Sequence, residues 1–328
     1  ARHHTLEEAL ANPNVDVLDL VLPILDMPGA IMACLNAGKS IMSEKPVNPY
    51  LFLGILALIW GSSFILMKEG LKHFSSYQVA AMRIGFAGIA LLPFVKWRKV
   101  VIQKGDLKYF IISGFLGSAL PSFLFTAAQT KISSSLAGAL NGLTPMFALL
   151  VGVLFIGVRL NKLKLFGVVF GLLGAYFLVA GKSLDFDIGY TSLAVLATIC
   201  YGINVNIIKQ KLNNYPPLLV AALPLAIISL MGIGVMLYIG FDFDVTNHQH
   251  IKSLGAIIIL AILGTSISLI LFNRLIQQTN TVFATSVTYL IPLVALFWGV
   301  LAGEEIHWTQ LAGLVSILIA IWLIRKDK

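Results

Sequence analysis

The chain contains little charge for its length. Of its 328 residues, 12% are Asp, Glu, Lys or Arg, whereas a soluble globular protein carries about 25%. Hydrophobic residues make up 58% of the chain, and its mean hydropathy is +0.90. This composition excludes a soluble protein of this size and predicts an all-α polytopic membrane protein.

Motifs for catalysis, metal binding and phosphate binding are also missing. Cys34 and Cys200, the two cysteines, stand in unrelated contexts, so neither a disulfide framework nor a metal site is indicated. His248 and His250 fall in a predicted loop, and no His or Cys stands beside a carboxylate within an apolar run. Without a glycine-rich phosphate loop, no ATPase site is predicted. We expect no cofactor, no metal and no catalytic residue, so any transport by this chain would be secondary.

The net charge of +8 does not indicate nucleic acid as a partner. The basic residues form short clusters between apolar runs, not a stripe with interleaved aromatic residues. If the first apolar run leaves the cytoplasm, most Lys and Arg residues fall in loops on the cytoplasmic side, as the positive-inside rule requires. The prediction is a multi-pass protein of the cytoplasmic (inner) membrane, with the lipid bilayer as a partner and both termini in the cytoplasm.

Ten apolar runs are long enough to cross a bilayer as helices. We place them near residues 50–68, 75–95, 107–128, 134–157, 163–181, 189–208, 217–240, 253–273, 280–302 and 306–324. The connections are short, which favours antiparallel packing of neighbours in the sequence. The longest connection is predicted around Phe241 to Lys252.

The same membrane pattern occurs twice in the chain. The run from Trp60 to Lys68 is echoed 141 positions later by the run from Tyr201 to Lys209. Because each half holds five spans, an odd number, the second half must cross the membrane in the opposite sense. The prediction is therefore a pair of inverted five-helix repeats, residues 48–182 and 183–328, as in transporters that work by alternating access. A second set of matches, at an offset of 147, joins Gly117, Phe125, Ala137 and Pro145 to Gly264, Phe272, Ala284 and Pro292.

The sequence from about residue 48 to the C-terminus resembles the EamA family of the drug/metabolite transporter superfamily. The resemblance rests on the run from Ala57 to Phe64, on Arg83, on the segments 137–145 and 284–292, and on Gly303-Glu304. It implies two inverted five-helix repeats around a central cavity that the first four helices of each repeat line. It also implies export of amino acids, other small metabolites or drugs. One departure is that Gly157-Val158 stands in the first half where the second half has Gly303-Glu304.

The first 47 residues differ from the rest. Their pattern predicts strand, helix and strand, and with Glu44-Lys45-Pro46 they resemble a middle fragment of the Gfo/Idh/MocA oxidoreductases. The glycine-rich turn that a dinucleotide site needs does not precede residue 12. A segment this short is marginal as a folding unit. We expect a truncated, non-functional α/β-like appendage, with fusion, gene-prediction error and chimeric assembly all open as its origin.

Polar and aromatic residues near the middle of spans are the candidates for substrate binding, because a polar group in lipid is costly unless it faces a cavity or a partner. The polar candidates include Asn204 together with Asn206 in the sixth span, and the residues predicted to line a cavity are Trp60, Asn141, Tyr201, Asn204 and Tyr289. The alternatives are plain packing for the aromatic residues and interhelical hydrogen bonding for the asparagines.

Arg83 is the basic residue well inside a span, and its guanidinium could bind a carboxylate as a fork. The alternative is that it pairs with carbonyls or an acid, or snorkels to the interface. Pro121, Pro145 and Pro292 each remove a backbone hydrogen bond within a span and are candidate hinges, or simple kinks. Glycines of the fifth span, such as Gly171, suit close helix packing or a homodimer contact.

The reading that joins these observations is a secondary transporter that exports a small-molecule substrate, an organic metabolite, by alternating access. A membrane-tethered oxidoreductase that uses residues 1–47 is one alternative. A passive channel is the other. The doubled pattern favours the transporter, since ten helices in two matched halves are more than an anchor needs.

Overall fold

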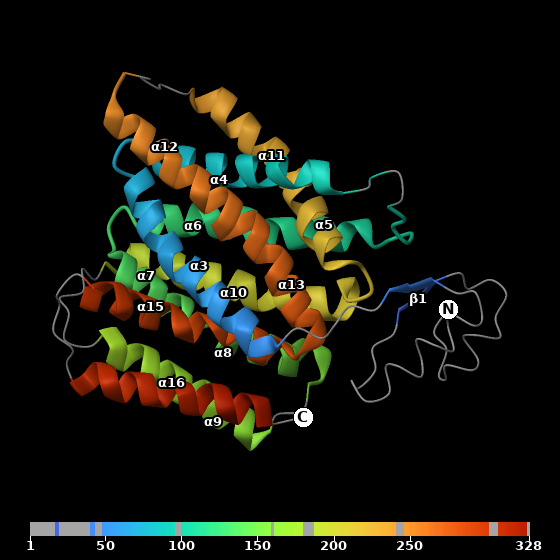
Figure 1. The fold of residues 1–328 in the computed structure, drawn as a ribbon, viewed down its shortest axis with the longest axis vertical. Helices are drawn as coiled ribbons and strands as arrows, with labels where there is room; N and C mark the ends of the chain where they lie inside the picture. Colours follow the sequence, from blue (N-terminus) through green and yellow to red (C-terminus); the bar gives the residue numbers. More distant parts are fainter. Residues whose placement is uncertain are drawn as a thin grey trace. The chain divides into compact units, whose positions relative to one another are not determined.

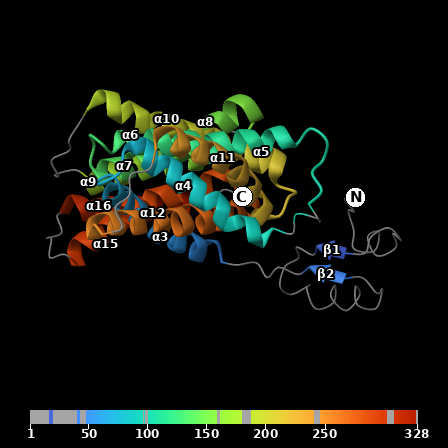
Figure 2. The ribbon, with the colours of Figure 1, turned by 90° about the horizontal axis from the view of Figure 1, so that it is seen from above.

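The computed structural model describes residues 17–19, 40–42, 48–95, 97, 100–158, 161–179, 187–240, 246–301 and 308–326. The chain separates into two units, Ala1–Asn48 and Pro49–Lys328. In the first unit, β1 (Val17–Asp19) and β2 (Ser40–Met42) pair in parallel, with Leu18 opposite Ile41 (Figure 2). Parallel pairing agrees with the predicted pair of strands. The helix predicted between them lies outside the described residues.

The second unit is built of helices, and the described residues include seven runs that are long and apolar enough to cross a membrane. They coincide with seven of the ten predicted spans. The runs are Pro49–Gly70, Ser76–Phe94, Leu107–Ala128, Leu136–Ile156, Ile188–Leu212, Pro217–Ile239 and His248–Gln278. The other three predicted spans coincide with α9 (Lys162–Val179), with α14 (Thr281–Thr285) followed by α15 (Val287–Leu301), and with α16 (Trp308–Lys326).

The remaining helices make up the seven runs, and α7 begins two residues before its run (Figure 1). They are α3 (Pro49–Gly70), α4 (Ser76–Leu91) with η1 (Leu92–Phe94), α5 (Leu107–Gly114) with η3 (Phe115–Ala119) and α6 (Leu120–Ala128), α7 (Ser134–Asn141) with α8 (Thr144–Val151) and η4 (Gly152–Ile156), α10 (Ile188–Ile207) with η5 (Ile208–Leu212), α11 (Pro217–Ile239), and α12 (His248–Ala261) with η6 (Ile262–Ile267) and α13 (Ser268–Gln278).

Side-chain caps fix where several helices begin. Ser75 and Gln78 form a reciprocal capping box at the start of α4. Asn247 accepts a hydrogen bond from the backbone N–H of Gln249 through its Oδ1 atom at 2.9 Å and starts α12 at His248. The prediction of a loop that extends to Lys252 was therefore wrong, and His248 and His250 belong to the first turn of α12.

Two membrane runs change to π-helical geometry near their middles. The π-helical segments η4 and η5 stand at the ends of their runs, whereas η3 of the first half and η6 of the second stand in the middle. Segments η3 and η6 start at Phe115 and Ile262, which are separated by the same 147 positions as the matched Gly117 and Gly264. A π segment leaves the regular i to i−4 ladder and is frequent at functional sites. These two segments are the local feature that positions the cavity described below.

Helices from the two halves pack against one another in matching pairs. Helix α4 packs along α11, and α9 packs along α16 (Figure 1). Glycines permit these close approaches. A Cβ atom at Gly88 would lie 2.5 Å from Ser229 Cβ, and one at Gly174 would lie 2.9 Å from the carbonyl oxygen of Gly313. The glycines of the fifth span therefore serve packing within the chain.

The outer surface of the helices is apolar, and aromatic residues stand at helix ends. Leu237 and Tyr238, at the end of α11, are 81% and 92% exposed, and Trp308, at the start of α16, is 85% exposed. Exposed apolar side chains along helices, with aromatic residues near the ends, are typical of a lipid-facing surface. The second unit is an all-α, multi-pass membrane protein.

Candidate functional site

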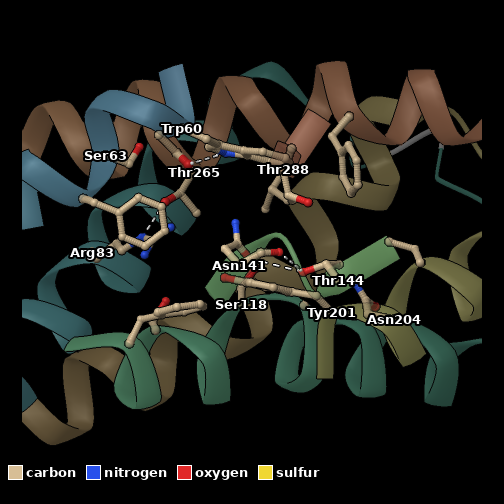
Figure 3. A pocket seen from close by; sticks show the side chains of 18 of the residues that line it. Trp60, Ser63, Arg83, Ser118, Asn141, Thr144, Tyr201, Asn204, Thr265 and Thr288 are labelled. Carbon is tan, nitrogen blue, oxygen red and sulfur yellow. Dashed lines mark hydrogen bonds between the residues drawn. The ribbon is translucent and has the colours of Figure 1, made fainter. Parts of the chain in front are cut away.

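A central cavity lies among helices of both halves and encloses about 850 Å³ of space that no protein atom occupies, counting the part open to solvent. Its walls come from α3, α4, η3, α6, α7, α8, α10, η5, η6, α13 and α15 (Figure 3). Five of the six predicted substrate-binding residues line it: Trp60, Arg83, Asn141, Tyr201 and Asn204.

The Trp60 side chain forms one aromatic wall of the cavity. Its Nε1 atom donates a hydrogen bond of 3.1 Å to the backbone carbonyl of Gly264, in the π-helical segment η6 (Figure 3). Its ring packs edge-on against Phe272, with ring centroids 4.9 Å apart. Both contacts join α3 to the run that contains η6 and α13. The indole is therefore held from two sides and presents a fixed face to the cavity.

Tyr201 forms the matching wall on α10. Its ring stacks on Phe125 of α6, with centroids 6.2 Å apart and an interplanar angle of 23°. Tyr201 is the repeat partner of Trp60, and Phe125 is the repeat partner of Phe272. Each half of the sequence thus supplies one aromatic pair, and each pair joins the first span of one half to the third span of the other.

Asn204 and Ser63 occupy a second pair of matched positions beside the two π segments. A Cβ atom at Gly117 would collide with the Asn204 amide, and one at Gly264 would lie 2.7 Å from Ser63 Oγ. These glycines are needed because the neighbouring side chain fills the space that a Cβ atom would take. The buried Oδ1 atom of Asn204 accepts no hydrogen bond from any described residue.

Arg83 brings a buried positive charge to the cavity from α4. Its Nε atom donates a hydrogen bond of 2.9 Å to Thr265 Oγ1. The side chain is 9% exposed, so it does not snorkel to the surface. It forms no salt bridge with an acid among the described residues. Among the described residues that line the cavity, Arg83 is the only one with a formal charge.

Asn141 lies at the end of α7, where the chain turns into α8. Thr144 donates its hydroxyl hydrogen toward the Asn141 backbone carbonyl at 2.8 Å or toward the Asn141 Oδ1 atom at 3.2 Å. Thr144 and Asn141 are thus joined across the helix break, and the Asn141 amide faces the cavity (Figure 3).

Comparison with known proteins identifies the family. The sequence model of the EamA-like transporter family matches residues 48–180 and 189–326, which together form most of the chain. The chain belongs to the EamA-like transporter family. The match begins at residue 48, and the predicted resemblance of residues 1–47 to the oxidoreductases finds no support in the comparisons. Membership of this family makes the chain a transporter, not an enzyme.

Several relatives are similar to this EamA-like protein over most of their length. The "Uncharacterized inner membrane transporter YedA" of Escherichia coli (strain K12) is 26% identical, over 82% of this chain and 88% of the relative. The "Probable amino-acid metabolite efflux pump" of Salmonella typhimurium is 24% identical, over 83% of this chain and 93% of the relative. A solved crystal structure shares the fold, with a TM-score of 0.67 and 16% identity over 85% of this chain and 98% of that chain.

Tyr289, the sixth predicted binding residue, does not line the cavity of this EamA-like transporter. It is fully buried in α15, and its hydroxyl lies 3.4 Å from the Val168 carbonyl of α9. Its ring fills the space above Gly171, where a Cβ atom would collide with it. The prediction that Tyr289 lines the cavity was wrong, because its ring occupies the space that Gly171 of α9 leaves open.

The prolines predicted as hinges stand at different places in their helices. Pro121 follows η3 in the first turn of α6, and Pro145 lies in the first turn of α8, after the helix break at residues 142–143. Pro292 lies inside α15. The second helix break, at Ser286, comes six residues before Pro292. The two breaks are therefore not at equivalent positions, and a hinge role stays a prediction.

Hydroxyl and amide groups that the sequence did not single out also line the cavity. They are Ser63, Ser118, Ser122, Thr144, Thr265, Asn273 and Thr288. Doubling of the pattern could have found two of them, because Ser63 is the repeat partner of Asn204 and Thr288 is the repeat partner of Asn141 at the offset of 147. The others were not singled out, since hydroxyl groups in helices commonly bond to the preceding turn, as Thr144 does to the Asn141 carbonyl at 2.8 Å.

The described residues hold no group of three or more His, Cys, Asp or Glu that could bind a metal ion. Cys200 is buried and unpaired, and Cys34 lies outside the described residues. What the described cavity offers is aromatic surface, hydroxyl and amide groups, and one guanidinium. That arrangement can bind a small molecule and has no evident nucleophile with a paired base.

Proposed function

We propose that this EamA-like protein is a secondary transporter that exports small organic metabolites by alternating access. The observation that carries the proposal is the central cavity, whose walls come in matched pairs from the two halves of the chain. A site at the interface of two repeats is the arrangement in which rocking of one repeat against the other exposes the site to each side in turn. The description of the Salmonella relative as an amino-acid metabolite efflux pump supports export of amino acids or related compounds.

The proposed architecture is ten transmembrane helices in two inverted repeats, residues 48–182 and 183–328. Matching contacts support it. Trp60 packs on Phe272 as Tyr201 packs on Phe125, and Gly61 meets Val294 as Gly202 meets Phe147.

Helix pairs follow the same rule. Helix α3 packs against α15 as α10 packs against α8. Helix α4 contacts α12 as α11 contacts α5. Such a set of reciprocal contacts is what an approximate two-fold axis would generate.

The proposed substrate site consists of Trp60, Arg83, Asn141, Tyr201 and Asn204. The position of these residues in the membrane supports their assignment to the site, because each lies in the interior of a membrane run, where a polar group needs a partner or a wet cavity. Pro121, Pro145 and Pro292 are the proposed hinges. A homodimer remains a prediction.

The proposed location is the cytoplasmic (inner) membrane, with both termini in the cytoplasm. The positive-inside rule supports this orientation, because Lys209, Lys211 and Arg274 fall on the same side as the C-terminal Lys and Arg residues. The printed name of the Escherichia coli relative, an inner membrane transporter, supports the compartment. We assign residues 1–47 no part in transport, because they belong to a separate unit that the family match leaves out.

A metabolite-efflux screen tests this function. Cells that express the full chain are loaded with labelled amino acids, organic acids, amines and neutral compounds, and export is followed with time. The expected result is faster export of at least one compound, and loss of that gain in the variant Asn204→Ala with unchanged membrane abundance. Unchanged export of every compound by the parent chain would overturn the proposal.

A further inference from the structure

The cavity carries a positive charge at one end and no described negative charge to balance it. The Arg83 side chain lines the cavity and lies at one side of the cavity view (Figure 3). Its described hydrogen bond uses Nε, with Thr265 Oγ1 as acceptor at 2.9 Å. No Asp or Glu stands among the described residues that line the cavity. A buried charge of this kind is costly unless a partner of opposite charge binds it.

Thr265 holds the Arg83 guanidinium in one orientation. The Thr265 hydroxyl accepts from Arg83 Nε and donates to the Leu260 carbonyl at 3.2 Å. The hydroxyl hydrogen is therefore committed to its own helix, and the oxygen lone pair to the guanidinium. With Nε fixed, the two terminal nitrogens form a planar fork that suits the two oxygens of a carboxylate.

The opposite part of the cavity contains hydrogen-bond acceptors that lack donors. Asn204 and Asn273 both line it, and their buried Oδ1 atoms accept no hydrogen bond from any described residue. Their side chains belong to α10 and α13, and Asn204 lies across the view from Arg83 in Figure 3. A buried acceptor left without a donor costs about 1–3 kcal/mol. These two oxygens call for an N–H or O–H donor.

Between the two ends, two aromatic walls flank the polar side chains of Asn141, Thr144 and Thr288 (Figure 3). Trp60 with Phe272 and Tyr201 with Phe125 form the two packed pairs already described. Ring faces of this kind favour a flat apolar body. The cavity therefore differs from a general hydrophobic pocket, because a positive charge stands at one end, unsatisfied amide oxygens stand at the other, and aromatic rings with a few polar side chains lie between them.

We infer that the substrate class is an organic acid that places its carboxylate on Arg83, its apolar body between the aromatic pairs, and a hydrogen-bond donor on Asn204 and Asn273. The inference rests on the proposed function and narrows it. It excludes neutral compounds and amines without a carboxylate as preferred substrates. Arg83 is then the residue that determines specificity for charge, and Thr265 is the residue that positions it.

The test compares acids with their own primary amides. Purified full chain in proteoliposomes is given labelled pairs that differ in the carboxylate alone, aliphatic and aromatic, including 4-hydroxyphenylacetate with 4-hydroxyphenylacetamide. Phenylacetate lacks the phenol hydroxyl of 4-hydroxyphenylacetate and is added to test the hydrogen-bond donor that faces Asn204 and Asn273. The variants are Arg83→Gln, Arg83→Lys, Asn273→Ala, and Lys131→Gln as a control that removes an exposed positive charge far along the chain. Thermal unfolding of each purified variant shows whether it is folded.

For the parent chain, at least one acid should bind and be transported about tenfold or more better than its amide, the size expected for a lost charge-assisted bond. Arg83→Gln should abolish that preference, Arg83→Lys should keep part of it, and Lys131→Gln should leave it unchanged. The parent chain should transport 4-hydroxyphenylacetate better than phenylacetate, and Asn273→Ala should reduce that difference. Export of neutral compounds or amines but of no acid would overturn this inference and leave the proposed function standing. Transport of no compound of any class would overturn both.

Discussion

Asn204 and Asn206 stand two positions apart on α10 and have different surroundings. Asn206 is buried outside the cavity, and its Nδ2 atom donates to the Ala148 carbonyl at 2.8 Å and to the Gly202 carbonyl at 2.9 Å. Asn204 lines the cavity and has an acceptor without a donor. The Asn206 amide ties α10 to α8, whereas the Asn204 amide is available to a ligand.

The two alanine variants should therefore fail in different ways. Asn206→Ala should lower the free energy of unfolding by about 0.6–2 kcal/mol, the range for interhelical amide bonds in membranes, and leave the apparent substrate affinity of the folded fraction unchanged. Asn204→Ala should leave thermal unfolding near that of the parent and weaken apparent affinity several-fold. Thermal unfolding and transport kinetics on the same preparations check both. Equal effects of the two substitutions on affinity would contradict the assignment.

Depth, polarity and the doubled pattern were enough to predict five cavity residues from the sequence. Tyr289 was misplaced because the direction of a buried ring depends on which neighbour leaves space, and here Gly171 does. Thr265 was missed because its hydroxyl matters through a bond to Arg83, 182 positions away in the chain. Such long-range pairs are decided by packing between halves, which periodicity along one helix does not report.

At the scale of elements, the π-helical segments η3 and η6 open the cavity on two sides. Each contains a glycine whose missing Cβ atom leaves room for a side chain of the opposite half, Asn204 beside Gly117 and Ser63 beside Gly264. The helical spans around them were predictable from apolar runs of bilayer length. The change to π geometry was not, because one residue of extra winding leaves no mark in hydropathy.

Adding one methyl group at each glycine tests the role of these segments. Gly117→Ala should push the Asn204 amide out of place, and Gly264→Ala should do the same to Ser63 Oγ, which would lie 2.7 Å away. Both should reduce transport several-fold while the protein remains folded. Gly85→Ala in α4 is the matched control, since nothing lies within 4 Å of its added Cβ, and alanine is the better helix former by about 1 kcal/mol. Normal transport by Gly117→Ala would argue against the η3 surface as part of the site.

At the scale of the whole molecule, two lysines in matched positions tie helix ends together. Lys68 donates to the Gln129 carbonyl at 2.8 Å, at the end of α6. Lys209, its repeat partner, donates to the Ile276 and Gln277 carbonyls at 2.9 and 3.0 Å, in the last turn of α13. Cations suit the negative ends of helices. In inverted repeats these two ties stand at opposite faces of the membrane.

Removing the hydrogen bonds of Lys68 or of Lys209 should favour conformations in which the cavity is open to opposite faces of the membrane. With Ser118→Cys as a cavity probe in a chain with serine at positions 34 and 200, Lys209→Met should raise labelling by an impermeant thiol reagent from the cytoplasmic side. Lys68→Met should raise labelling from the other side, since each substitution frees the helix end at its own face. Lys131→Met, in an exposed loop position, should change neither rate. Shifts toward the same face for both variants would count against inverted repeats.

Counterflow tests the central claim, that the cavity between two matched halves binds substrate and is exposed to one side at a time. Proteoliposomes with the full chain are loaded with a high concentration of an unlabelled compound found in the efflux screen, and the labelled compound is added outside at low concentration. We expect a transient accumulation of label above its outside concentration, which Asn204→Ala reduces. Equilibration of the label without such an overshoot is the behaviour of a passive channel and would contradict the account.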